Sequence, residues 1–227
     1  MSDGLRLVIF DVDGTLVDSQ RDIVAAMEVA FAAVARPMPQ RSEVLGVVGL
    51  SLDVIFPRLA PDLPADAHLQ MCEAYKAAYI DMRARTGVKK SSPLYPGAIE
   101  MLRRLHAMPE ILLGVATGKS RRGLDKLIEG HGLQGLFVTQ QVADHHPSKP
   151  HPSMILQAMA ETGIAPQDTV MIGDTSFDMD MAAAAGVRGI GVEWGYHNRD
   201  ALGSATVLID SYGGLLPALN EIWSVPA

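Results

Sequence analysis

Short apolar segments that alternate with helix-like segments are the feature that most restricts how this 227-residue chain can fold. Six runs have strand character, over residues 5–10, 111–116, 136–138, 169–172, 188–192 and 206–209. Most of them are continuously apolar instead of alternating with polar residues, which is typical of strands covered on both faces. The sequence therefore predicts an α/β protein with a parallel sheet.

Helical patterns separate these strands, and their ends carry the expected punctuation. The patterns span residues 97–108, 120–131, 152–162 and 176–185. Pro96 precedes the first pattern and Gly186 follows the last, as proline before a helix and glycine after one commonly do. Strands joined through helices in this way lie parallel in one sheet.

The alternation is broken between residues 18 and 93, where no strand is expected. Helical patterns follow one another there, over residues 22–34, 42–48 and 65–85. The Ser/Pro/Gly-rich segment SSPLYPG marks the return to the alternating pattern. We interpret residues 17–91 as a helical domain inserted into a core that consists of residues 1–16 and 92–227.

Composition excludes several classes of function. The formal net charge is -7 and no Lys/Arg-rich block is present, so a nucleic-acid partner is not expected. No apolar stretch approaches the ~20 residues that span a bilayer, and the amino terminus does not resemble a signal peptide. We therefore expect no membrane contact and a cytoplasmic location. Cys72 is the only cysteine, which rules out an internal disulfide.

Two of the predicted strands run directly into acidic residues. Asp11 and Asp13 follow the first strand, in DVDGT, and Asp174 and Asp178 follow the fourth, in GDTSFD. The carboxyl ends of parallel strands meet at one edge of a sheet, where open α/β sheets bind ligands. The alternatives are solvated turn residues for the first pair and helix capping by Asp174 or Ser176 in the second segment.

Two further loops are expected at the same edge. Thr117, Gly118 and Lys119 follow the second strand, and Lys149 lies in the loop DHHPSKPHP. Because an acidic protein needs a local positive charge to bind an anionic substrate, a lysine or a metal ion at this edge would supply it. Four loops thus converge on one predicted site.

Two common motifs are excluded by their spacing. An EF-hand calcium loop that begins at Asp11 would need Gly at position 16 and Glu at position 22, where the chain has Leu16 and Asp22. A nucleotide-binding P-loop that ends at Gly118 would need Gly at position 113, where the chain has Leu113.

In order along the chain, DVDGTLVDS, ATGKS, SKP and GDTSFDMDMA resemble the four motifs of the haloacid dehalogenase superfamily. The segments VVGLSL and GVEWGYH resemble its phosphoglycolate-phosphatase-like branch. This resemblance spans most of the chain. It implies a Rossmann-like three-layer α/β core with an inserted α-helical cap domain. It also implies hydrolysis of a small-molecule phosphate monoester through an aspartyl phosphate, with 2-phosphoglycolate as the leading substrate.

The resemblance further implies a role for each motif residue. Asp11 would attack phosphorus, and Asp13 would protonate the leaving oxygen and then activate water. The expected phosphate-binding residues are Asp11, Thr117, Gly118 and Lys149. The expected Mg²⁺ ligands are Asp11, the backbone carbonyl of Asp13, and Asp174, with Asp178 as a ligand or a close neighbour. The presence of Asp13 disfavours a dehalogenase, since the dehalogenases of this superfamily lack that second aspartate.

Several alternatives stay open at this stage. An inorganic pyrophosphatase or a sugar phosphomutase of the same superfamily would carry the same motifs, and a non-catalytic phosphate-binding module is a third possibility. The expected partner is a small phosphorylated metabolite, and the chain could be a monomer or a homodimer. His145, His146 and His151 are interpreted as plain loop residues, with a metal ligand or a substrate contact as the alternatives. Lys119, Arg121 and Arg122 are interpreted as an exposed helix start or as added positive charge at the edge of the site, and Trp194 as packing or as pocket lining. Gly49, Leu50 and Ser51 are interpreted either as contacts to the site or as a simple turn.

Overall fold

The structure, a computed structural model, describes residues 4–224. Its described residues form a six-stranded sheet in the spatial order β3-β2-β1-β4-β5-β6, and every neighbouring pair is parallel. The strands are β1 (Arg6–Phe10), β2 (Ile111–Thr117), β3 (Thr139–Val142), β4 (Thr169–Gly173), β5 (Arg188–Val192) and β6 (Val207–Ile209). The predicted α/β class with a parallel sheet is confirmed.

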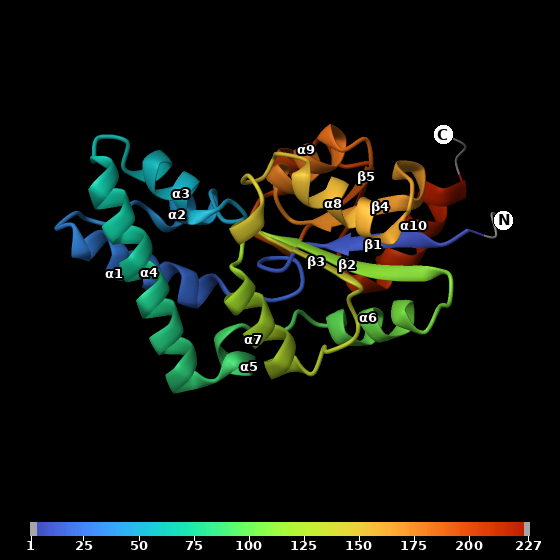
Figure 1. Cartoon of the computed structure of the whole chain (residues 1–227), viewed down its shortest axis with the longest axis horizontal. Coiled ribbons are helices and arrows are strands. Elements are labelled where there is room, and N and C mark those ends of the chain that lie inside the picture. Colours follow the sequence, from blue (N-terminus) through green and yellow to red (C-terminus); the bar gives the residue numbers. More distant parts are fainter. Residues whose placement is uncertain (1–3, 225–227) are drawn as a thin grey trace.

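Helices cover both faces of the sheet and complete three layers (Figure 1). One face is covered by α6 (Ala98–His106), α7 (Arg121–His131) and α10 (Leu215–Ser224). The other face is covered by α8 (Ser153–Thr162) and α9 (Ser176–Ala184). Short 3₁₀ turns lie at Ala143–His145, Pro166–Asp168, Arg199–Leu202 and Tyr212–Gly214. Because side chains alternate along a strand, Val8 and Phe10 of β1 enter the first layer while Leu7 and Ile9 enter the second.

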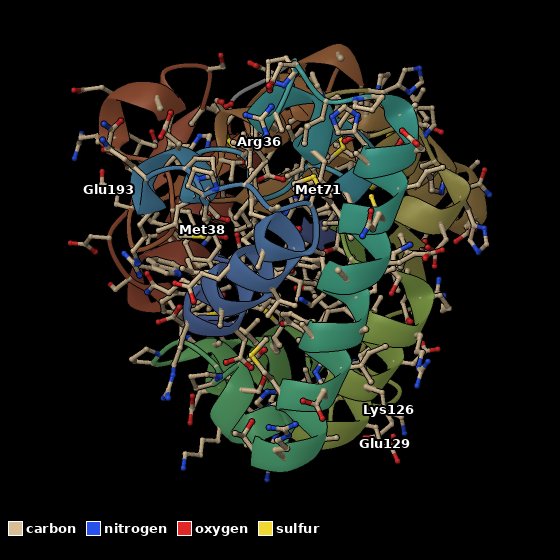
Figure 2. All side chains as sticks on the ribbon, turned by 90° about the vertical axis from the view of Figure 1, so that its left-hand side faces the viewer. Arg36, Met38, Met71, Lys126, Glu129 and Glu193 are labelled. Atoms are coloured by element: carbon tan, nitrogen blue, oxygen red, sulfur yellow. The ribbon has the colours of Figure 1, made fainter. Side chains whose placement is uncertain are left out.

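A helical insertion, residues 20–91, lies between β1 and β2 in the sequence and beyond the carboxyl edge of the sheet in space (Figure 1). Its helices are α1 (Gln20–Ala33), α2 (Arg41–Leu45), α3 (Leu52–Leu59), α4 (Ala65–Thr86) and α5 (Val88–Ser91). The insertion has an apolar core of its own, in which Met27, Phe56 and Met71 are fully buried. Figure 2 looks onto this side of the molecule, with Met71 near the middle of the view. Cys72 is half-buried against the same core.

The two chain segments that join the insertion to the sheet run side by side. The amide of Asp18 donates to the carbonyl of Pro93 over 2.9 Å, and the amide of Tyr95 donates to the carbonyl of Leu16 over 3.0 Å. The outgoing segment leaves β1 through a tight turn at Gly14, whose φ of 89° lies in the left-handed region that favours glycine. The insertion is therefore attached next to the end of β1.

The predicted third strand was wrong by several residues, because the observed strand is Thr139–Val142 and not 136–138. Phe137 packs into the core and Val138 is 57% exposed, so the apolar run is not the strand itself. The true strand is polar. Its Thr139 hydroxyl and Gln141 amide are buried and donate to Glu161, over 2.5 and 2.8 Å. Hydrophobicity alone could not identify a strand whose buried side chains are paired in this way.

The remaining elements follow the prediction closely, with α3, α5 and α10 as additions to it. α3 contains Pro57 inside the helix, and because proline usually ends a helix, the sequence pattern did not predict a helix there. Within residues 4–224, no helix combines the length and apolar character required to cross a membrane.

Candidate active site

The register of the sheet places Asp11 between the ends of two neighbouring strands. Phe10 is paired with Val115 of β2 and with Ile172 of β4, and the amide of Asp11 donates to the carbonyl of Ile172 over 2.9 Å. Asp11 follows Phe10, so by alternation its side chain points to the face of Ile9, which α8 and α9 cover. The residue is 1% exposed.

Lys149 and Asp178 meet Asp11 on that face. Lys149 lies just before α8, and its Nζ is 2.7 Å from Asp11 Oδ1 and 2.7 Å from Asp178 Oδ1. All three side chains are buried. Burial by itself would lower the pKa of Lys149, but the charges of Asp11 and Asp178 outweigh it and raise that pKa above its ordinary value. Lys149 therefore stays positively charged between two carboxylates.

The first turn of α9 fixes the position of Asp178. Thr175 caps the helix: its hydroxyl oxygen accepts from the Asp178 amide at 3.3 Å, while Asp178 Oδ2 accepts from the Thr175 amide at 3.1 Å. This reciprocal arrangement is a capping box. The cap is thus neither Asp174 nor Ser176, which were the alternatives considered from sequence. As a result Asp174 is left free to turn toward the strand ends.

Asp174 is held by the loop after β1 and by the loop after β5. Its Oδ1 accepts from the Thr15 hydroxyl at 2.9 Å, and its Oδ2 accepts from the Tyr196 amide at 2.8 Å. Two glycines let these loops approach. A Cβ at Gly14 would lie 2.1 Å from Asp174 Oδ2, and one at Gly195 would lie 2.1 Å from Asp174 Cβ. Both positions therefore exclude any larger residue while Asp174 stays in place.

Asp11, Asp174 and Asp178 form a buried carboxylate cluster, with one oxygen of each within 4.8 Å of the others. Burial raises the pKa of Asp11 to about 7; Lys149 opposes this shift, and Asp178 and Asp13 add to it. The pKa of Asp174 is also raised, by burial and by the charges of Asp178 and Asp11. Three buried carboxylates with one lysine leave an excess of negative charge that a cation would offset.

The donor set of this cluster fits a magnesium ion. Within residues 4–224, neither Asp11 oxygen has an aligned hydrogen-bond donor, although both oxygens are buried and Lys149 lies close to one of them. Magnesium prefers oxygen ligands and takes one or two carboxylates together with substrate phosphate and water. Both oxygens of Asp178 already accept hydrogen bonds, from Lys149 and Thr175. Asp11 is therefore the side chain most available to a cation, since each oxygen of Asp174 also accepts a hydrogen bond, from Thr15 and from Tyr196.

Asp13 is not a member of this cluster, and its carboxylate is held by Lys119 and Ser19. Lys119 Nζ lies 2.7 Å from each Asp13 oxygen, and the Ser19 hydroxyl donates to Asp13 Oδ1. The prediction of an exposed Lys119 was wrong, since its side chain is only 9% exposed. Its partner is 106 residues away in the sequence, so no local pattern could reveal the pair.

The helical insertion is docked on the strand-end loops. The amide of Ser51 donates to the Ser148 hydroxyl at 2.9 Å, and Gly49 and Leu50 lie against Gly118, where a Cβ would be 2.6 Å from the Gly49 carbonyl oxygen. From α4, the ring of Tyr79 lies 5.1 Å from Lys119 Nζ. Residues 49–51 lie in the connection between α2 and α3, where Gly49 is in a turn, and they also contact the strand-end loops, so both interpretations of this segment hold.

Three other residues singled out in the sequence, Thr117, His146 and Trp194, lie around the strand ends or pack nearby. Thr117 is the last residue of β2 and is buried, and its hydroxyl accepts from the Lys119 amide at 3.2 Å. His146 bonds to Ser153 and Gln141 and lies outside the carboxylate cluster. Trp194 packs as expected, 4.8 Å from the ring of Tyr212, and its indole also donates to the carbonyl of Thr15.

Sequence reasoning missed four residues that position the others: Thr15, Ser19, Tyr79 and Tyr196. Thr15 lies within the first motif, directly after the DVDG turn, and Ser19 closes that motif. A hydroxyl within an acidic motif indicates a possible hydrogen-bond donor to one of its carboxylates, and these two do donate, to Asp174 and to Asp13. Tyr196 lies in GVEWGYH, and its hydroxyl accepts from the Ser19 amide at 3.0 Å. Tyr79 comes from the middle of α4 and had no distinguishing signal.

Proteins of known family are similar to this chain in sequence. The family model described as haloacid dehalogenase-like hydrolase matches residues 8–192. A probable phosphatase, IndB, of Dickeya dadantii (strain 3937) is 35% identical over 223 residues, which cover 95% of this chain and 94% of that protein. A phosphoglycolate phosphatase of Salmonella typhimurium is 29% identical over 239 residues, which cover 95% of this chain and 93% of that protein.

Solved structures agree on the fold. The crystal structure of a predicted phosphoglycolate phosphatase from Haemophilus somnus 129pt superposes with a TM-score of 0.83 at 24% identity, covering 96% of this chain and 99% of that one. A β-phosphoglucomutase from Clostridium difficile superposes with a TM-score of 0.82 at 19% identity, covering 97% of each chain. With a family model matched over most of its length, this chain belongs to the haloacid dehalogenase-like hydrolases.

Proposed function

We propose that this enzyme, a phosphatase of the haloacid dehalogenase-like family, hydrolyses a small phosphate monoester in a Mg²⁺-dependent reaction. The observation that carries the proposal is the buried contact of Lys149 with Asp11 and Asp178, next to Asp174. A positive charge beside a carboxylate that has no aligned donor is what a phosphoryl group needs in order to approach a nucleophile.

In the first step, an oxygen of Asp11 attacks phosphorus and the bond from phosphorus to the ester oxygen breaks. Asp13, protonated for this step, gives its proton to the departing oxygen, so the leaving group departs with a hydroxyl and not as an alkoxide. Lys149 binds the phosphoryl oxygens and offsets the repulsion between two anionic groups. Thr117 and the amide of Gly118 supply further donors at the adjacent strand end.

In the second step, the aspartyl phosphate on Asp11 is hydrolysed. The carboxylate of Asp13 removes a proton from water as the water oxygen attacks phosphorus, and the bond to Asp11 breaks. Inorganic phosphate leaves and both carboxylates return to their starting forms. Asp178 keeps Lys149 in position throughout, since it contacts the same Nζ as Asp11, also at 2.7 Å.

The residues that would hold Mg²⁺ are the side chains of Asp11 and Asp174 and the backbone carbonyl of Asp13, with Asp178 beside them. When bound, the ion would supply positive charge that offsets the negative charge of the phosphoryl group. Thr15 and Tyr196 orient Asp174 for this task through their hydrogen bonds.

We propose 2-phosphoglycolate as the substrate, which is supported by the phosphoglycolate phosphatases among the relatives. Residues 17–91 would act as a cap that closes over the ester and excludes water. A small phosphorylated metabolite is the proposed partner, and both a monomer and a homodimer are compatible with this reaction. A cytoplasmic location fits such a substrate.

Two other activities of the same family are alternatives to this function. A sugar phosphomutase would return the phosphoryl group from Asp11 to a sugar, and it would require a bisphosphate activator. An inorganic pyrophosphatase would release two phosphates from one substrate. A non-catalytic phosphate-binding module, the third alternative, would bind esters without turning them over.

A phosphate-release screen tests the proposal. The substrates are 2-phosphoglycolate, sugar phosphates, nucleotides and pyrophosphate, each with Mg²⁺ and with EDTA, and the matched blank is Asp11→Asn. We expect release from a monoester that requires Mg²⁺, needs no activator and is absent in the Asp11→Asn variant. Release that continues in EDTA or in the Asp11→Asn variant would contradict the mechanism, and release from pyrophosphate alone would favour the pyrophosphatase.

A further inference from the structure

The side chain of Lys119 lies between the core and the insertion, beside the proposed acid. Its Nζ is 2.7 Å from both oxygens of Asp13 and 3.4 Å from the hydroxyl oxygen of Tyr79, which α4 supplies from the insertion. The ammonium is thus almost enclosed when the insertion is docked.

A second cation lies at the same aromatic ring. The guanidinium of Arg83 is 5.0 Å from the centroid of the Tyr79 ring, and its Nη1 donates to the carbonyl of Gly123 over 3.1 Å. Its Nε and Nη2 are buried and have no hydrogen-bond partner within residues 4–224. The group formed by Asp13, Tyr79, Arg83 and Lys119 therefore carries two positive charges and one negative charge.

The charges of Lys119 and Asp13 are close together and almost enclosed. Lys119 Nζ lies 2.7 Å from both Asp13 oxygens, and the Lys119 side chain is only 9% exposed. A buried cluster with an excess positive charge is costly unless an anion completes it. The unpaired donors of Arg83 point to the same conclusion, because a buried donor without a partner destabilises the closed arrangement.

The position of this excess positive charge, next to Asp13, indicates which part of a bound substrate would contact it. Asp13 is the proposed proton donor to the ester oxygen, so a cation bonded to both of its oxygens lies close to the leaving alcohol. An alcohol with a carboxylate on the carbon next to the ester oxygen would bring its charge to Lys119. A neutral alcohol of the same size would leave the excess charge uncompensated.

We propose that Lys119 is the residue that selects the substrate, by binding a carboxylate carried by the leaving alcohol. Tyr79 and Arg83 complete this subsite from the insertion, so the acid group is bound only when the insertion is docked. The inference rests on the proposed phosphatase function and deepens it, because it assigns phosphorylated hydroxy acids as the substrate class and names the residue that recognises them.

The test compares two esters of similar size, one with a charged leaving group and one with an uncharged leaving group. 2-Phosphoglycolate carries the carboxylate, and 2-hydroxyethyl phosphate replaces it with a neutral alcohol of nearly the same size. The quantity measured is the ratio of kcat/KM for the acid to kcat/KM for the neutral ester, for the wild type, Lys119→Met and Lys119→Arg. A loss of activity that acts only through Asp13 lowers both values and leaves this ratio unchanged.

We expect the wild type to prefer the acid, and Lys119→Met to reduce the ratio by about 10- to 100-fold, the effect of one charge-assisted hydrogen bond. Lys119→Arg should keep part of the preference. The matched control is Lys126→Met, since Lys126 lies on α7, the helix that follows Lys119, but pairs with Glu129 at the exposed surface (Figure 2). An equal preference in the wild type, or an unchanged ratio in Lys119→Met, would overturn the proposal.

A binding measurement tests the preference for the acid without any turnover of the ester. In an Asp11→Asn background with Mg²⁺, the dissociation constants of both esters are compared with and without Lys119→Met. The preference for the acid should be lost with the lysine, and its persistence would refute the inference. Failure of the inference and failure of the proposed function are distinct, since the wild type would still release phosphate from monoesters in the first case and from none in the second.

Discussion

The fit between Gly118 and the insertion leads to the sharpest prediction, which concerns the Gly118→Ala variant. An added Cβ would lie 2.6 Å from the carbonyl oxygen of Gly49 and 3.0 Å from that of Leu50, whereas an ordinary contact begins at 3.4 Å. Both obstacles are backbone atoms, so no side chain can turn away to relieve the clash. The φ of Gly118 is not among the positive values, so alanine itself is tolerated by the local backbone.

The size of the effect follows from these distances. The insertion must withdraw by about 0.8 Å to restore an ordinary contact, and the hydrogen bond from Ser51 to Ser148, now 2.9 Å, would lengthen to about 3.7 Å and break. A misplacement of about 1 Å at a reacting centre can cost about 100-fold in rate. We therefore expect kcat/KM for a small monoester to fall by about 10- to 100-fold.

The assay is Mg²⁺-dependent phosphate release, together with a thermal melt of each variant. Gly203→Ala is the control, because a Cβ there would meet its nearest neighbour at 3.8 Å. Inhibition by inorganic phosphate should change little in Gly118→Ala, since phosphate alone does not need the insertion to close. A Gly118→Ala enzyme with wild-type kcat/KM would refute the claim that close docking of the insertion is needed for turnover.

Three further predictions concern the carboxylates. Asp13→Asn should slow steady-state turnover by about 10²- to 10⁴-fold while substrate still binds, and an unaltered rate would remove Asp13 from the mechanism. Thr15→Val deletes the hydroxyl that donates to Asp174, so the Mg²⁺ concentration for half-maximal activity should rise by about 10- to 100-fold; an unchanged requirement would show that this hydrogen bond does not orient a ligand. Because burial raises the pKa of Asp11 to about 7, protons compete with Mg²⁺ below that pH, and the apparent Mg²⁺ affinity should rise with pH and level off above it. Titrations followed by tryptophan fluorescence would check this trend, and an affinity that does not vary between about pH 5.5 and 7.5 would contradict it.

Much of the fold was predictable because the signals that define it are local. The apolar runs of β1, β4 and β5 are long enough to be recognised, and the helices between them carry ordinary start and stop residues. β3 was misplaced because its buried Thr139 and Gln141 are satisfied by Glu161, 22 and 20 residues away. Pairing at that distance leaves no trace in a local hydrophobic pattern.

The catalytic candidates were also predictable, because the strand-end motifs carry both the acids and their position at the edge of the sheet. What sequence could not assign is which acid pairs with which cation. Lys149 bridges Asp11 and Asp178, whereas Lys119 pairs with Asp13 instead of facing solvent. Each of these pairs joins residues at least 29 positions apart, so it exists only once the strands are in register.

The sequence by itself determined the α/β class, the parallel sheet, the helical insertion and the identity of the acidic strand ends, because periodicity and turn chemistry act over a few residues. Only the tertiary structure decided that the insertion lies against Gly118, that Tyr79 reaches Lys119, and that Asp174 is clasped by Thr15 and Tyr196. The physical reason is that ion pairs, close backbone approaches and burial depend on distances between segments far apart in the chain, which the packing of the sheet and its helices sets.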